Sequence, residues 1–443
     1  MKAKTIILLV SILSPVFLRA QQNNPPESWS LTDCIDYALK QNIQVRQSIL
    51  ANLSDQVNKK QAETNKLPSV NASVRQNFSW SNAEDIATGN SAFTGNNSTS
   101  YSVSSSIMLY NGSRLNSLIK QAELDMQAGF YDSETIKESV TISILNAYLQ
   151  MLFTAEQVKN AERQMESTTE QLNLAQERLH LGIISQSDYL QVKSQLASEK
   201  LILANAGSQH AIARVNLMQL MELPVSENFN IVDPFMGDSI NQNLVPLASD
   251  VYATAVEIKP QIKSAGYNKE SAALNKKIAE AGYYPTLSAE AGLGTGYSNL
   301  SEAGYFSQLN DQISPSVGLS LSIPIFQKKQ VKTNVSLAEI QYQNAELQEI
   351  DTKNQLRKEI EQVCVDVVSA QTEYEASLEQ YHSTLESYKL AEEKFKNGLI
   401  NSVDFLYERT NYIVAESELL QSKYNLIFDY KILDFYTGKP ITL

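Results

Sequence analysis

The sequence predicts an α+β membrane protein that arose by internal duplication, with four β-strands and two very long helical hairpins in each chain. The first observation is a segment, 177–190, whose pattern recurs 216 residues later at 393–406. The second is a pair of stretches in each half where polar and apolar residues alternate, which is typical of strands with one wet face. The third is a helical pattern of about 68 residues without proline, roughly 100 Å of helix. The recurring residues are Glu177, Gly182, Asp188 and Leu190, which correspond to Glu393, Gly398, Asp404 and Leu406.

Residues 1–20 predict a secretory signal peptide. Lys2 and Lys4 precede a short apolar run, and Ala20 stands at its exit before a polar stretch. A basic start, an apolar core and a small exit residue are typical of export signals. The alternative is a transmembrane anchor, which would need a longer apolar run. No cysteine of the lipobox type follows, so we expect no lipid anchor, and the destination is the periplasm, the outer membrane or the cell exterior.

The composition argues against several classes of function. Removing residues 1–20 removes Lys2, Lys4 and Arg19, so the formal net charge of −13 becomes −16. A chain this acidic is not expected to bind nucleic acid. Two cysteines, Cys34 and Cys364, and three scattered histidines form neither a disulfide framework nor a metal site. No nucleophile–base pair or phosphate loop is recognisable, so we expect no enzyme activity, cofactor or metal.

The first repeat is expected over residues 31–224. Ser30 can cap a helix over 31–66, and Pro68 ends it. Two strands are predicted at about 67–81 and 100–111, separated by a loop rich in Asn, Gly, Ser and Thr. A helical hairpin over 113–222 follows, with its tip at Gly182 and with a heptad seam typical of coiled coils.

The second repeat is expected over residues 247–440, after a linker at 225–246. Strands are predicted at about 284–298 and 314–326, and the helical hairpin covers 329–437. The two halves align at an offset of 217 before the strands and of 216 after them. The anchors of this alignment are Pro68 with Pro285 and Pro224 with Pro440.

Four strands per chain create an edge problem. They cannot close a barrel around a channel, and open sheet edges cannot face lipid. Because each strand has one polar and one apolar face, as outer-membrane barrels require, we expect several chains to share one barrel. Phe78, Trp80, Tyr101 and Tyr297 could form its aromatic girdle. The alternative is a soluble sheet whose apolar face packs on protein.

The export signal, the duplicated order of elements, the strand entries at Leu67-Pro68 and Tyr284-Pro285 and the Gly182 and Gly398 tips resemble the TolC family of outer-membrane efflux proteins. This resemblance, over about 31–440, implies a homotrimer with a twelve-stranded β-barrel in outer-membrane lipid. It further implies that a long α-helical coiled-coil barrel continues into the periplasm, with the linker in an equatorial region. The family serves Gram-negative bacteria as a passive exit duct for an inner-membrane pump, joined through a periplasmic adaptor, in drug efflux or type I secretion.

The resemblance also implies that the two hairpin tips dock the adaptor. The contacts carried over are Leu181, Gly182 and Ile183 in the first tip and Asn397, Gly398 and Leu399 in the second. Asn397 departs from the family, which usually has a small apolar residue there. The alternative is that each glycine is needed only for its turn.

Asp188 and Asp404 correspond to aspartates that ring the periplasmic entrance in some members of the family. Three chains would place like charges around a narrow pore and favour cations. The alternative is local, since an aspartate in a first helical turn complements the helix dipole. Tyr407 stands where members with a charge-locked gate carry a second aspartate, and it could narrow the entrance by bulk.

Two other functions are left open by the pattern. A non-channel coiled-coil protein of the envelope, such as a spacer or adhesin, would share the long helices but has no need of amphipathic strands at matched places in both halves. A diffusion porin would share the strands, but four strands per chain and helices of roughly 100 Å fit it badly.

Overall fold

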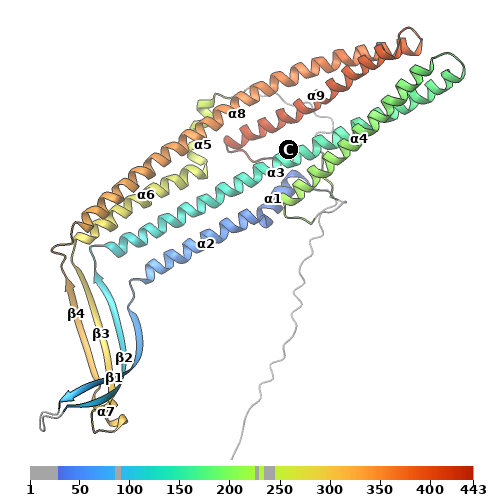
Figure 1. The fold of residues 1–443 in the computed structure, drawn as a ribbon. Coiled ribbons are helices and arrows are strands. Elements are labelled where there is room, and N and C mark those ends of the chain that lie inside the picture. The colour runs from blue at the N-terminus through green and yellow to red at the C-terminus, as the bar shows by residue number, and fades with distance from the viewer. Residues whose placement is uncertain (1–27, 85–90, 225–228, 234–244, 443) are drawn as a thin grey trace, which may run out of the picture.

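The computed structural model describes residues 28–84, 91–224, 229–233 and 245–442. The predicted signal peptide and most of the predicted linker lie outside these ranges. A layer of long helices continues at one end into a four-stranded sheet, and the two hairpin tips lie at the other end (Figure 1). No helix in the described ranges is both long and apolar enough to cross a membrane.

Each repeat contains two shorter helices, two strands and a long helical hairpin in the same order. Repeat two adds a short turn of helix, η1, and a helix, α7, that was not predicted. The elements of repeat one are α1 (Leu31–Gln41), α2 (Ile43–Thr64), β1 (Ser69–Glu84), β2 (Ser91–Tyr110), α3 (Arg114–His180) and α4 (Gln186–Leu220). Those of repeat two are α5 (Ala248–Ile258), α6 (Pro260–Glu280), η1 (Ala281–Tyr283), β3 (Thr286–Ser298), α7 (Tyr305–Asp311), β4 (Ser314–Ser322), α8 (Gln330–Lys396) and α9 (Ser402–Tyr436).

The single helix predicted over 31–66 is wrong, because the chain breaks at Asn42. Asn42 has an extended ψ of 132°, and its side chain accepts hydrogen bonds from the backbone N–H groups of Gln44 and Val45. Asparagine suits this N-cap role, which ends α1 and begins α2. Lys259 occupies the corresponding place in repeat two, where the chain breaks between α5 and α6.

The four strands form one antiparallel sheet in the order β1-β2-β3-β4, so β1 and β4 each have an open edge. The register confirms the alternation, because Ala72 faces Val103 and Val103 faces Leu293 across the ladder. These apolar residues therefore share one face, while serines and glycines share the other. On the apolar face Val70, Val74 and Val317 are all exposed.

The strand ends differ from those predicted. β1 and β2 pair from Ser69 with Ser106 to Glu84 with Ser91, through most of the stretch expected as a loop. The polar composition was misleading, because the ladder satisfies backbone groups whatever the side chains are. β4 ends at Ser322 rather than near 326, just before Pro324, which has no N–H to donate.

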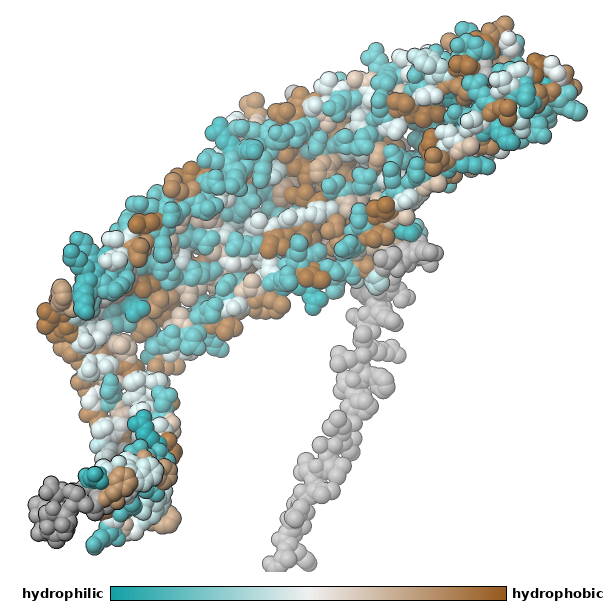
Figure 2. Space-filling model, in the orientation of Figure 1, coloured by the Kyte–Doolittle hydropathy of each residue, from teal (hydrophilic) through white to brown (hydrophobic). Residues whose placement is uncertain are grey.

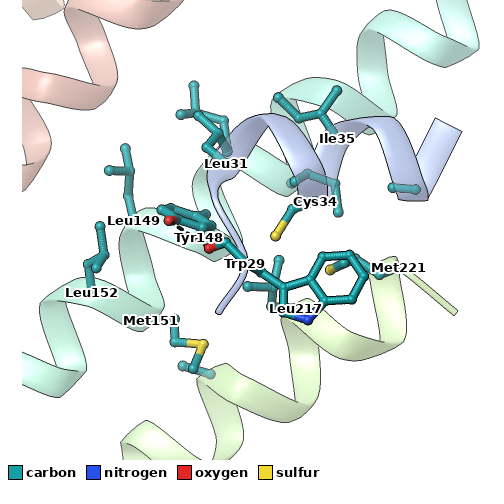
Figure 3. Close-up of a cluster of buried hydrophobic side chains, with 14 of the residues drawn as sticks. Trp29, Leu31, Cys34, Ile35, Tyr148, Leu149, Met151, Leu152, Leu217 and Met221 are labelled. Carbon is teal, nitrogen blue, oxygen red and sulfur yellow. Dashed lines mark hydrogen bonds between the residues drawn. The ribbon is translucent and has the colours of Figure 1, made fainter. Parts of the chain in front are cut away.

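The main hydrophobic core lies where α1, α3 and α4 meet, and it also includes residues of α9 (Figure 3). This part of the helical layer lies away from the sheet (Figure 1). Tyr148 is almost fully buried there, and its hydroxyl donates to the carbonyls of Val232 at 2.5 Å and Trp29 at 3.2 Å. A second, smaller core belongs to repeat two, and each of its buried members corresponds to a buried residue of the first. These members are Val251, Ala255, Ile262, Leu356, Ile360, Val367 and Leu433, the counterparts of Cys34, Ala38, Val45, Val140, Ile144, Met151 and Leu217.

Candidate functional site: the hairpin tips

Both tips turn on a glycine in the same backbone conformation. Gly182 and Gly398 each have φ of +72°, a left-handed conformation that glycine adopts without strain. The N–H groups of Ile183 and Leu399 then reach back to carbonyls of the preceding helix at 2.9 and 2.8 Å. A Cβ added to either glycine would meet no atom within 4 Å. The turn therefore needs glycine for its φ and not for space.

The helix after each turn begins with a different cap. In α4, the Asp188 carboxylate accepts from the Ser185 backbone N–H at 3.2 Å and from its hydroxyl at 2.7 Å, while Ser185 Oγ accepts from the Asp188 N–H. In α9, Asn401 Oδ1 accepts from the Asp404 N–H at 2.8 Å. The Asp404 carboxylate accepts no hydrogen bond from the described residues. Asp188 therefore completes a capping box, whereas Asp404 stays exposed with its charge uncommitted.

Large apolar side chains are exposed at both tips. Leu181, Ile183 and Leu399 are each about 70% exposed, and Tyr407 is 65% exposed one turn into α9. Asn397 is also exposed and forms the C-cap of α8. Exposed apolar residues clustered at one end of a protein are characteristic of an interaction surface.

A cavity of about 260 Å³ lies between the two tips and has both apolar and charged walls. Arg178 closes one side by donating from Nη2 to the backbone carbonyl of Lys396 at 3.1 Å, which ties the first tip to the second. Of the predicted site residues, the cavity wall contains Ile183, Asp188 and Gly398. Asp404, Tyr407 and the other predicted tip residues are not part of this wall.

The structure also contains a buried ion pair that the sequence did not indicate. Arg409 of α9 and Glu199 of α4 are 3% and 1% exposed, and their charged groups lie 3.7 Å apart. Arg409 also donates to the carbonyl of Gln164 on α3 at 2.9 Å, so one side chain contacts both helices of the other hairpin. The sequence contained one indication of a buried charge. Val192, Glu199 and Ala206 follow one another at intervals of seven residues on α4, and Glu199 is the only charged residue of the three.

Comparison with known proteins assigns this architecture to a family. Residues 34–222 and 251–439 match the family described as outer membrane efflux protein, one match for each repeat. The chain therefore belongs to the outer membrane efflux protein family. This confirms the predicted family, that of outer membrane efflux proteins.

The individual relatives are distant. The chain is 24% identical to an uncharacterized protein of Haemophilus influenzae over 53% of this chain and 50% of that protein. It is 25% identical to the pyoverdine export outer membrane protein OpmQ of Pseudomonas putida, over 48% of this chain and 43% of OpmQ. These matches thus span about half the length of the relatives or less.

Among solved structures, the outer membrane channel CmeC of Campylobacter jejuni is similar with a TM-score of 0.77 and 18% identity. The similarity covers 93% of this chain and 86% of that one. The predicted fold class, a four-stranded sheet continued by long helical hairpins, is therefore confirmed.

Proposed function

We propose that three copies of this chain form the exit duct of a tripartite efflux or type I secretion system. The duct is passive and receives drugs or other substrates from an inner-membrane pump through a periplasmic adaptor. The observation that carries this proposal is a sheet with one exposed apolar face and two open edges, attached to helices long enough to extend into the periplasm.

The open edges support the trimer. Edge β1 has 16 residues and edge β4 has nine, and within the described chain each pairs on one side only. An open edge in lipid leaves backbone groups without partners, at a cost of several kcal/mol for each. Pairing β4 of one chain with β1 of the next removes every edge and yields twelve strands in three chains.

The tips support adaptor docking. Leu181, Ile183 and Leu399 are exposed there, and Ile183 also lines a cavity with charged groups on its wall. Apolar surface beside charged groups suits a polar-apolar helical hairpin from another protein. In this proposal Leu181, Gly182, Ile183, Asn397, Gly398 and Leu399 form the docking surface, while Asp188, Asp404 and Tyr407 act at the entrance.

The test is the assembly and conductance of the protein purified from outer membranes in detergent. We expect the mass of a trimer and ion conduction in a planar bilayer, and a soluble monomer would overturn the proposal. For the docking surface, Gly182→Pro with Gly398→Pro should abolish efflux in cells while the trimer remains in the membrane. Normal drug resistance in that variant would exclude the tips as the docking site.

A further inference from the structure

The apolar surface of the sheet continues past the last residue of β4. Val317 and Leu321 are exposed on the apolar face of this strand, which ends at Ser322. Beyond it, Ile325 is 95% exposed and Phe326 is 81% exposed. Figure 2 shows hydrophobic side chains where the sheet joins the helical layer. Exposed apolar residues at the end of such a strand extend the surface that can contact lipid.

Three lysines follow within six residues of Phe326. Lys328 and Lys329 form the turn before α8, Lys332 lies in the first turn of this helix, and all three side chains are exposed. The sequence contains no acidic residue between Asp311 and Glu339. In the part of the chain that the structure describes, none of the three lysines belongs to an ion pair. The segment is therefore a basic cluster directly beside an apolar one.

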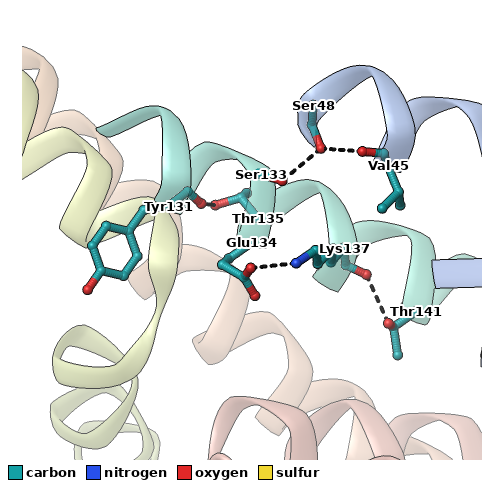
Figure 4. A network of polar contacts seen from close by, with 8 residues as sticks. All are labelled: Val45, Ser48, Tyr131, Ser133, Glu134, Thr135, Lys137 and Thr141. Carbon is teal, nitrogen blue, oxygen red and sulfur yellow. Dashed lines mark hydrogen bonds and ion pairs between the residues drawn. The ribbon is translucent and has the colours of Figure 1, made fainter. Parts of the chain in front are cut away.

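Several lysines elsewhere in the helical layer do have acidic partners. Figure 4 shows Lys137 paired with Glu134 on α3, where Nζ and Oε1 lie 2.6 Å apart. On α8 itself, Nζ of Lys353 lies 2.6 Å from Oε1 of Glu349. The lysines at the sheet end of α8 lack such a partner, so their charge is available to a group outside the chain.

The backbone of the turn does not favour lysine. Lys328 and Lys329 have φ of 49° and 63°, in the left-handed region. Their counterparts in repeat one, at the offset of 216, are Gly112 and Ser113, with φ of 62° and 66°. Glycine adopts this conformation without strain, whereas a Cβ opposes it. The turn would form more easily with the residues of repeat one, so the turn itself does not explain the two lysines.

The next copy of the chain does not supply the missing negative charge. In the proposed barrel, β4 pairs with β1 of the next copy, and the chain enters β1 through Lys66 and Leu67. Both residues are exposed, so this entry also combines a basic with an apolar side chain. The nearby Glu63 already has a partner in Lys59, 4.0 Å away. Charge complementarity therefore favours an anionic partner that is not another copy.

We propose that Lys328 and Lys329 bind the phosphate groups of anionic phospholipids in the inner leaflet of the outer membrane, while Ile325 and Phe326 insert among the acyl chains. The inference rests on the proposed function, which places this end of the sheet at the periplasmic side of the membrane. An apolar segment followed at once by lysines matches the order of acyl chains and phosphates at a bilayer surface. The cluster has to be local, because a chain with a formal net charge of −13 is otherwise repelled by an anionic surface.

The test is native mass spectrometry of the protein purified from outer membranes, after addition of either phosphatidylglycerol or phosphatidylcholine. The parent should retain more phosphatidylglycerol, which has a net negative headgroup. Lys328→Gly/Lys329→Ser, which gives the turn the sequence of repeat one, should lower the retained phosphatidylglycerol about fivefold or more and leave phosphatidylcholine unchanged. Lys328→Arg/Lys329→Arg should keep the preference, and added salt should weaken it in the parent.

The matched control is Lys193→Ser/Lys200→Ser, which removes the same charge from exposed positions on α4, away from the sheet (Figure 1). The control should retain phosphatidylglycerol as the parent does. The turn variant should melt no lower than the parent, because glycine relieves backbone strain, so misfolding would not account for its loss of lipid. A preference lost in the turn variant alone supports the site, whereas an equal loss in the control overturns it.

The remaining outcomes separate this site from the duct itself. A trimer that conducts ions but retains both lipids equally, or that keeps its preference in the turn variant, overturns the lipid site and leaves the proposed duct intact. A soluble monomer overturns the duct, and with it the placement at the membrane on which the lipid site depends.

Discussion

The two hairpins of this chain end in turns with the same backbone and different side-chain chemistry. Both glycines have φ of +72°, but the aspartate six residues later closes a capping box in the first tip and stays uncommitted in the second. The same residue type at the same offset therefore makes different local contacts in the two tips. The Asp188 carboxylate completes a capping box, whereas the Asp404 carboxylate accepts no hydrogen bond from the described residues.

The bodies of the hairpins differ as well. In the second hairpin, Tyr388 stacks on Tyr412 at 5.2 Å and Phe395 stacks on Phe405 at 4.7 Å. In the first hairpin, the counterparts of Tyr388 and Tyr412 are leucines. Duplication has thus preserved the backbone and the core, whereas the aromatic stacking between the two helices of a hairpin, α8 and α9, differs from that of the first hairpin.

The largest effect is expected from the buried ion pair between Glu199 of the first hairpin and Arg409 of the second. Arg409→Leu should destabilise the chain by about 3–5 kcal/mol, because Glu199 would stay buried without its partner. Glu199→Ala in the same chain should recover most of the loss, since repeat two already has Ala415 in that place. Thermal and denaturant midpoints of the two single variants and the double variant measure the coupling. Equal losses in the Arg409 single variant and the double variant would contradict it.

Substitution of the turn glycines should show that the backbones of the two hairpin tips are equivalent. Gly182→Ala and Gly398→Ala should each cost about 1–2 kcal/mol, because only the positive φ opposes a side chain there. The two losses should agree in denaturant unfolding. A large loss in one tip alone would mean that the two turns are not interchangeable.

Asp429 is a further difference between the two hairpins, because its counterpart in the first hairpin is the buried Ala213. Burial, together with nearby Asp366 and Glu373, raises the pKa of Asp429 from 3.8 to about 6. The folded state binds this proton more tightly than the unfolded state, so the contribution of Asp429 to stability falls as the pH rises from about 4 to 6. Asp429→Ala should raise stability by about 1 kcal/mol at pH 7, after allowance for partial exposure, and by almost nothing at pH 4. Melting curves at both pH values test this, and a gain that is the same at pH 4 would exclude the carboxylate as its cause.

The smallest expected effect on stability is the difference between substitutions of the two tip aspartates, Asp188 and Asp404. Asp188→Ala removes a capping box and should cost roughly 0.5–1 kcal/mol, more than Asp404→Ala. Asp404→Ala should instead lower cation selectivity in single-channel recordings, and Tyr407→Ala should raise conductance more than it changes selectivity. Unchanged selectivity in Asp404→Ala would leave both aspartates with helix-start roles alone.

The sequence predicted those features whose cause is local. Gly182, Gly398 and Pro68 end helices through their own backbone chemistry, and the change of period from 3.6 to 2 marks the strands. The break at Asn42 was missed because the apolar pattern continues on both sides of it, and α7 was missed because a seven-residue helix carries little periodicity.

Contacts between distant residues could not be predicted in the same way. Glu199 and Arg409 lie 210 residues apart, so no spacing rule joins them. The cavity between the tips likewise depends on how two separately encoded hairpins come together. The positions of the two tips could be predicted from the sequence because the same residue pattern occurs in both repeats.

The order of the strands has a consequence for how the chain reaches its final state. β1 with β2 and β3 with β4 are sequence neighbours, but the central pairing joins Ser98 to Ser298 across an entire helical hairpin. Closing a loop of about 200 residues is slow, since its entropy must be lost before the contacts form. We expect the two local strand pairs to form early and the complete sheet late. During translocation the nascent polypeptide would therefore have twice as many unpaired strand edges as the finished subunit, and for that interval it would be most prone to aggregation.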